Sequence, residues 1–227
     1  MKVSLTFDNG PSAGTTPFVL DTLRDAGVRA TFFQVGKSLR IPEARSILQR
    51  ILAEGHAIAN HSLTHTVPLG LCDAETAVRE IAENAALLES LGAPSRVFRP
   101  FGGGGNLNQE LLHPAAVAHL QDQGMTCITW NCVPRDWVEP DLWCDRALAD
   151  IQTRDWSVVV IHDLPGRGME QHLARFLAEA KALGAEFTLD FPDDCAPIRD
   201  GRPQWDISHL VAPASPSQPP AAAAASH

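Results

Sequence analysis

The sequence predicts an α/β protein with a parallel sheet of about seven strands. Three features predict it: short apolar runs alternate with amphipathic segments, glycines end many of these segments, and polar residues follow several of the runs. Regular alternation of strands and helices requires right-handed parallel crossovers. The pattern leaves two architectures open, a doubly wound sheet and a closed or nearly closed (β/α) barrel. No G-x-G-x-x-G sequence follows the first strand, which weakens the dinucleotide-binding form of the doubly wound sheet.

The first strand ends in an abrupt turn. An apolar run over residues 3–7 is followed directly by Asp8, Asn9, Gly10 and Pro11. Glycine permits positive φ and proline lacks the donor that a sheet ladder requires, so the strand must stop here. We therefore expect Asp8 and Asn9 at the carboxyl end of a buried strand, where α/β proteins carry their chemistry. An ordinary acidic turn is the alternative.

Six helices and six further strands follow the first strand. Apolar residues of the second helix fall at positions 44, 47, 48, 51 and 52, the spacing of a core-facing helix. Asp73 is a candidate N-cap, Pro114 stands in a first turn, and glycines follow helix ends at positions 27, 55, 92, 124 and 184. The predicted helices are Thr16–Ala26, Pro42–Glu54, Asp73–Leu91, Pro114–Gln123, Asp141–Gln152 and Glu170–Leu183. The predicted strands between them are Ala30–Val35, Ala57–Ala59, Val97–Phe98, Thr126–Trp130, Ser157–Ile161 and Glu186–Leu189.

Composition and charge exclude several classes of partner. The 227 residues suffice for one large domain, with 44% apolar and 20% charged residues. A net charge of −9 argues against nucleic acid and anionic membranes. No apolar run approaches the ~20 residues that span a bilayer. The chain opens on a predicted strand, so we expect a cytoplasmic protein.

The five cysteines form no C-x-x-C pair, which favours reduced thiols.

The last residues differ in composition from the rest of the chain. Residues 212–227 are almost entirely Ala, Pro and Ser. We expect one domain over residues 1–211 and a disordered tail over residues 212–227.

Polar and aromatic residues follow five of the predicted strands. They are Asp8 and Asn9, His61 and His65, Arg99, Asp136 and Trp137, and His162 and Asp163. The carboxyl ends of parallel strands meet at one rim, so these side chains should line one pocket.

The histidines have distinct expected roles. On a helical turn, His61 and His65 would point the same way and could hold one metal ion at Zn–N distances of about 2.0–2.1 Å, with a third ligand from the Asp8–Asn9 turn. Two surface histidines are the alternative. His162 leaves an apolar strand and could act as a general acid, or be an ordinary strand-end histidine.

Arg99 and the glycines that follow it are further candidates. Arg99 could bind a carboxylate through two hydrogen bonds. The glycines at positions 102–105 suggest close backbone approach to a ligand, or a flexible loop.

Five ordered motifs resemble those of the polysaccharide deacetylase family, also called the NodB-homology domain or carbohydrate esterase family four. The matching segments are Leu5–Pro11 for T-F-D-D-G-P, His61–His65 for H-[ST]-x-x-H, Phe98–Gly102 for an R-P-P-Y-G type motif, Arg135–Pro140 for D-W-x-x-P and Val160–Asp163 for L-x-H-D. The resemblance implies a distorted (β/α) barrel of about seven parallel strands with its active site at their carboxyl ends. It also implies metal-dependent removal of acetyl groups from N-acetylated saccharides, such as chitooligosaccharides or peptidoglycan fragments.

The resemblance also implies a role for each site residue. Asp8 would be the general base, Arg99 would fix its carboxylate, His162 would protonate the departing amine, and Asp136 would orient this network. His61, His65 and Asn9 would hold a divalent metal, zinc in the first place, with cobalt or another divalent ion as the alternative. Four residues would contact the substrate: Phe101, with a backbone amide near it at the oxyanion, Trp137 and Val160 around the acetyl methyl group, and Gly102.

The sequence departs from the family pattern at several positions. Asn9 stands where most members have a second Asp, Val133 stands where many have another Asp, and the third motif lacks one proline. Phe101 replaces a tyrosine, a residue that the whole chain lacks. An amide oxygen is a neutral and weaker ligand, so two rival functions stay open: a metal-free or weakly metal-dependent amidase acting on a small linear or cyclic amide, and a catalytically impaired sugar-binding relative.

Overall fold

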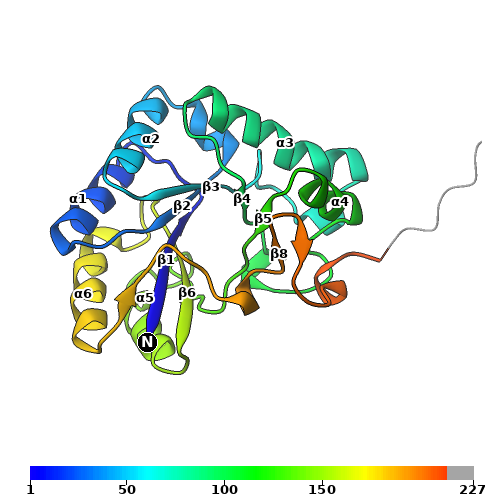
Figure 1. Cartoon of the computed structure of the whole chain (residues 1–227). Helices are drawn as coiled ribbons and strands as arrows, with labels where there is room; N and C mark the ends of the chain where they lie inside the picture. The colour runs from blue at the N-terminus through cyan, green and yellow to red at the C-terminus, as the bar shows by residue number, and fades with distance from the viewer. Residues whose placement is uncertain (214–227) are drawn as a thin grey trace, which may run out of the picture.

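One curled sheet forms the centre of the molecule. The computed structural model describes residues 1–213, and within them nine strands form a sheet of order β6-β1-β2-β3-β4-β5-β8-β9, with β7 also paired to β1 (Figure 1). The strands are β1 Lys2–Asp8, β2 Thr31–Gln34, β3 Ala57–Asn60, β4 Val97–Phe98, β5 Thr126–Cys127, β6 Trp156–His162, β7 Glu186–Phe187, β8 Ile198–Arg199 and β9 Arg202–Pro203. The first seven strands pair in parallel, and β8 and β9 pair antiparallel.

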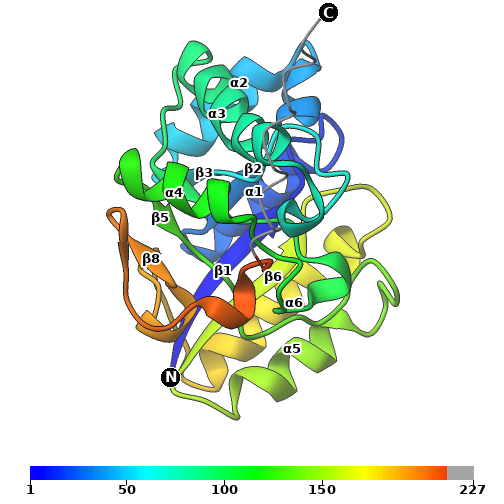
Figure 2. The same cartoon turned by 90° about the vertical axis from the view of Figure 1, so that its right-hand side faces the viewer.

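Six α-helices lie around the outside of this sheet. They are α1 Thr16–Ala26, α2 Ala44–Ala53, α3 Ala74–Ser90, α4 Pro114–Asp122, α5 Trp143–Ile151 and α6 Met169–Ala182. In Figure 2, β1 crosses the middle of the molecule, with α2 and α3 on one side and α5 and α6 on the other. Short 3₁₀ turns span Gly36–Arg40, Leu69–Leu71, Gly103–Gly105, Asp193–Cys195 and Ser208–Leu210. No helix within residues 1–213 is long and apolar enough to cross a membrane.

The sheet curls far enough to form a distorted barrel, as expected. Strand β5 ends at Cys127, and five residues further on an isolated parallel bridge joins Cys132 to β6. In this bridge the Cys132 amide donates to the Val158 carbonyl at 3.2 Å, and the Val160 amide donates to the Cys132 carbonyl at 3.0 Å. One bridge in place of a full ladder leaves this side of the barrel nearly open.

Alternation along β1 decides which side chains enter the barrel. Val3, Leu5 and Phe7 are buried in the cluster that joins the sheet to the helices. Successive strand residues face opposite sides, so Thr6 and Asp8 face the interior instead. Burial of the apolar side chains against the helices therefore fixes which residues of β1 face the barrel interior, and Asp8 is the last of these.

The fold confirms the six predicted helices and the seven predicted strands, mostly with ends that are a few residues shorter. The β8–β9 hairpin was not predicted. Its strands have two residues each and no apolar alternation, although the Asp200-Gly201 turn, with φ of 47° and 74°, carries the Asn/Asp-Gly chemistry of tight hairpins. From residue 214 on, the predicted tail lies outside the described residues.

Candidate active site

A pocket of about 320 Å³ opens at the carboxyl ends of the strands. Nine of the eleven predicted site residues line it, namely Asp8, Asn9, His61, His65, Phe101, Gly102, Trp137, Val160 and His162. The other two, Arg99 and Asp136, are fully buried and contact lining residues from behind. The structure therefore brings together residues that stand as far apart in the chain as Asp8 and His162, as expected for the shared rim of parallel strands.

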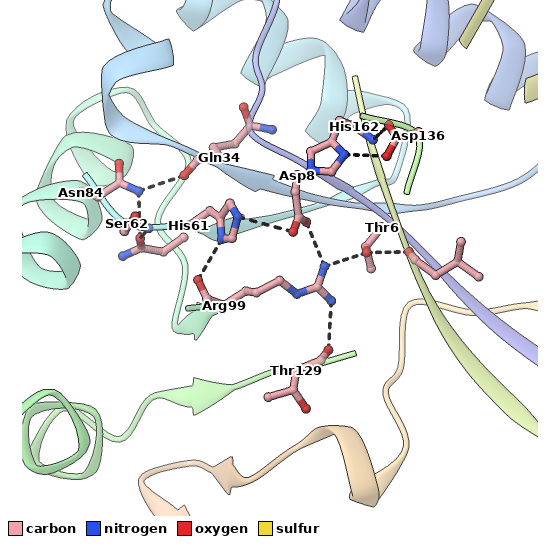
Figure 3. A network of polar contacts seen from close by, with 12 residues as sticks. Thr6, Asp8, Gln34, His61, Ser62, Asn84, Arg99, Thr129, Asp136 and His162 are labelled. Atoms are coloured by element: carbon pink, nitrogen blue, oxygen red, sulfur yellow. Dashed lines mark hydrogen bonds and ion pairs between the residues drawn. The ribbon is translucent and has the colours of Figure 1, made fainter. Parts of the chain in front are cut away.

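A buried ion pair anchors the pocket floor (Figure 3). Arg99 follows β4, and its Nη1 donates to Asp8 Oδ1 at 2.8 Å and to Thr6 Oγ1 at 2.7 Å. Its Nη2 donates to the Thr129 carbonyl at 3.2 Å, and the guanidinium carbon lies 3.8 Å from the centre of the Phe33 ring. Burial lowers the pKa of Arg99 and Asp8 opposes that shift. Since an arginine ordinarily titrates near 12.5, the guanidinium stays charged and fixes one carboxylate oxygen.

The imidazole of His61 faces the same carboxylate. Its Nδ1 lies 2.9 Å from the Arg99 carbonyl, which can only accept, so Nδ1 carries the proton and Nε2 presents a lone pair. Burial lowers the pKa of His61 to about 3, which keeps the ring neutral. Its Nε2 lies 3.4 Å from Asp8 Oδ2. Two acceptors thus face each other in a buried place, an arrangement that a cation between or beside them would stabilise.

Two further possible ligands border this place. The ring centre of His65 lies 4.7 Å from that of His61, and burial lowers the pKa of His65 to about 2. Asn9 has a φ of 74°, a left-handed conformation that asparagine tolerates well, and its buried Oδ1 has no hydrogen-bond partner in the described part of the chain. Within residues 1–213 no three His, Cys, Asp or Glu side chains form a group that could hold a metal ion.

The prediction of a helical turn at His61–His65 is wrong. These residues form an irregular loop in which Ser62 and His65 have φ of 65° and 51°. The H-x-x-x-H spacing fits a helix, but here local hydrogen bonds compete with the helical ones. The two rings still converge, because the loop is held at both ends.

Helix α3 holds this loop through two buried side chains. Glu80 accepts from the Thr64 amide at 2.8 Å and from its hydroxyl at 2.7 Å. Asn84 donates at 2.8 Å to Asn60 Oδ1, which also accepts from the Ser62 amide at 2.9 Å (Figure 3). Helical spacing places Glu80 and Asn84 on one face of α3, so the helix positions the loop that carries both histidines.

His162 lines the pocket from the end of β6, and Asp136 lies behind it. The ring Nδ1 of His162 lies 2.8 Å from Asp136 Oδ1, and the His162 amide donates to Oδ2 at 2.9 Å. Burial by itself would lower the pKa of His162, but the hydrogen bond and charge of Asp136 raise it above its ordinary value of 6.5. The Trp137 ring lies edge-on to His162 at 5.3 Å. Nδ1 is occupied by Asp136, so Nε2 is the nitrogen free to exchange a proton with a bound molecule.

Asp163, the last residue of the fifth motif, packs against the turn that follows β1. It accepts from the Thr16 hydroxyl at 2.5 Å, and a Cβ added at Gly10 would lie 2.5 Å from its carboxylate oxygens. Burial raises the pKa of Asp163 to about 6. Its packing explains why glycine follows Asn9.

Trp130 and Arg167 also line the pocket, although neither was predicted as a site residue. The Trp130 indole donates to the Gly105 carbonyl at 3.0 Å, and a Cβ added at Gly102 would lie 2.4 Å from its ring. The glycine run is therefore a wall packed tightly on a tryptophan. A tryptophan at the end of a predicted strand was the available signal for Trp130, while Arg167 had none.

Comparisons with known proteins identify the family of the chain. The family model for polysaccharide deacetylase matches residues 1–126. The chain belongs to the polysaccharide deacetylase family. A chitooligosaccharide deacetylase from Rhizobium leguminosarum bv. trifolii is 34% identical over 71% of this chain and 71% of that protein. A peptidoglycan-N-acetylglucosamine deacetylase from Bacillus cereus is 30% identical over 82% of this chain and 84% of that protein.

A solved structure confirms the fold. A family 4 carbohydrate esterase from Streptomyces lividans, in complex with acetate, superposes with a TM-score of 0.70 over 87% of this chain and 97% of that chain. The two are 24% identical, so this likeness concerns the fold alone.

The α3 anchor can be tested with Glu80→Gln. The amide would place a donor against the Thr64 donors, and leaving a buried donor unsatisfied costs about 1–3 kcal/mol of unfolding free energy. Denaturant unfolding should show a loss in this range. Glu83→Gln, an exposed residue one position before Asn84, is the matched control and should unfold like the wild type. Equal stability of the two variants would contradict the anchoring role.

Proposed function

We propose that the protein is a hydrolase that removes the acetyl group from an N-acetylated saccharide, with a divalent metal bound by His61, His65 and Asn9. The observation that carries this proposal is the buried lone pair of His61 Nε2 facing Asp8 Oδ2 at 3.4 Å, with the second acid–base pair, His162–Asp136, in the same pocket. The similarity to chitooligosaccharide and peptidoglycan deacetylases supports the substrate class.

The donor set fits zinc. Two neutral imidazoles and one amide oxygen would leave an open position for water, as catalytic zinc sites do. When bound, such an ion supplies Lewis acidity toward water and toward a carbonyl oxygen. With Asn9 in place of a carboxylate, the ligand set is neutral, so the bound ion would keep more of its positive charge.

Asp8 and His162 would divide the proton transfers. Arg99 holds Asp8 Oδ1, which leaves Oδ2 to accept the proton of the attacking water. His162, protonated at Nε2, would donate to the amine nitrogen as its bond to the acetyl carbon breaks. The two residues end neighbouring strands, with Asp8 in register with His162, so base and acid reach the pocket side by side.

The remaining lining residues would bind the acetyl group. The Phe101 amide donates to no other group within residues 1–213, so it can donate to the oxyanion of the tetrahedral intermediate. Trp137 and Val160 supply apolar surface for the methyl group.

A weakly metal-dependent amidase is the second candidate. The neutral Asn9 favours it, because a carboxylate at this position would bind a divalent ion more strongly. The intact pair of neutral imidazoles, His61 and His65, supports the metal-dependent enzyme instead. Metal analysis of the purified protein separates the two.

Asp8→Asn tests the base. Removing a general base costs about 10²–10⁴-fold in rate, so acetate release from acetylated chitooligosaccharides should fall by this amount while metal stays bound. His61→Ala should lose both metal and activity. The exposed Asp122→Asn is the control for the charge change. Full activity in Asp8→Asn or His61→Ala would refute the assignment.

Asn9→Asp tests the third ligand. A carboxylate should lower the dissociation constant for zinc, measured by competition with a chromophoric chelator, because it adds a negative charge to the ligand set. Chelator treatment of the wild type should abolish acetate release, and added zinc should restore it. Unchanged zinc affinity in Asn9→Asp would show that residue 9 is not a ligand.

Asp136→Asn tests the acid through its pH dependence. His162 must be protonated to act, so activity should fall as pH rises through its pKa. Asp136 raises that pKa, so its loss should move the alkaline limb of the kcat/KM profile to lower pH and reduce the rate on the order of 10²-fold. Asp141→Asn, which removes the exposed partner of His172, is the control. An unmoved alkaline limb would contradict the role of His162.

A further inference from the structure

Arg167 places a positive charge in the pocket wall. Its Nη1 donates to the Trp137 carbonyl at 3.3 Å, and among the described residues its buried Nε has no partner. Within residues 1–213 it takes part in no ion pair. A half-buried guanidinium without a counter-ion loses hydration without gaining an attraction, which indicates that its partner comes from outside.

The backbone fixes where this side chain starts. Arg167 stands between Gly166 and Gly168, whose φ angles are 73° and 70°. A Cβ added at Gly168 would lie 2.4 Å from the Pro140 carbonyl oxygen, so the loop packs against the segment that follows Trp137. This contact and the hydrogen bond to Trp137 hold the arginine beside the proposed acid, and a bound group would meet a preorganised cation.

The charges of the pocket favour an anionic ligand. Asp8 is the only carboxylate among the lining residues, and Arg99 already pairs with it. Arg167 is therefore a cation without a counter-ion in this pocket, although the chain as a whole carries a net charge of −9. The Arg167 charge also opposes protonation of His162, a conflict that a bound anion would remove.

We propose that Arg167 binds a carboxylate of the substrate, so that the preferred N-acetylated saccharide is an acidic one. After the bond to Trp137, the guanidinium keeps donors on Nη1 and Nη2, enough for a two-pronged contact with a carboxylate. The carboxylate stands on the sugar that loses its acetyl group or on the neighbouring sugar. This inference rests on the proposed function and narrows its substrate class.

Matched substrate pairs test it. N-acetylmuramic acid and N-acetylglucosamine differ by a lactate ether on the same sugar. Disaccharides that join N-acetylglucosamine to glucuronic acid or to glucose differ by a carboxylate on the neighbour. The wild type should prefer the acidic member of at least one pair by about tenfold or more in kcat/KM, since charge-assisted hydrogen bonds are worth at least that much. The preference should shrink as salt is added.

Variants assign the preference to one residue. Arg167→Gln should bring the acidic-to-neutral ratio close to one, through KM for the acidic member, and Arg167→Lys should keep part of it. Arg96→Gln is the control. Arg96 is exposed, directly precedes β4 and donates to the Gln123 carbonyl. Like Arg167, it forms no ion pair within residues 1–213. Its ratio should equal that of the wild type.

The outcomes separate this inference from the proposed function. Equal kcat/KM for both members of both pairs, or a preference that survives Arg167→Gln, would overturn the role of Arg167 and leave the deacetylase intact. If no saccharide is deacetylated, the proposed function fails. Calorimetry then measures the dissociation constants of the same four saccharides for the wild type and for Arg167→Gln. The wild type should bind the acidic member of at least one pair more tightly, and Arg167→Gln should bind both members about equally.

Discussion

The buried pair between Arg99 and Asp8 is the interaction on which the rest of the site depends. Both charges lie out of water, where an unpaired carboxylate would be very costly, so each requires the other. The pair also joins β1 to the segment after β4, strands that are not neighbours in the sheet. Curling the sheet is what brings them within reach, so the barrel and the ion pair support each other.

The pocket imidazoles of His61 and His162 show how one scaffold shifts two histidine pKa values in opposite directions. His61 and His162 each use Nδ1 to donate within the protein and present Nε2 to the pocket. A neutral carbonyl leaves burial to dominate at His61, which lowers its pKa, whereas the Asp136 carboxylate raises the pKa of His162. The first ring is thereby suited to hold a cation and the second to hold a proton.

Sequence patterns predicted the elements and the gathering of the site, because both follow from local periodicity and from the shared rim of parallel strands. They could not predict contacts set by packing. The His61–His65 loop is not helical, since Glu80 of α3 accepts from the Thr64 amide and Asn84 holds the Asn60 side chain that accepts from the Ser62 amide. The glycines near Trp130 form a packed wall, and Arg167 enters the pocket through a loop without regular pattern. The family resemblance supplied roles for the motif residues, but Arg167 lies outside every motif.

Anomalous diffraction at the zinc edge, from crystals grown with zinc, would show whether these residues bind the metal. We expect one strong peak in the pocket, about 2.0–2.1 Å from Nε2 of His61 and from a ring nitrogen of His65, with Asn9 Oδ1 as the third protein ligand and Asp8 beside it. A pocket without such a peak at saturating zinc, or a peak that His61 does not contact, would contradict it.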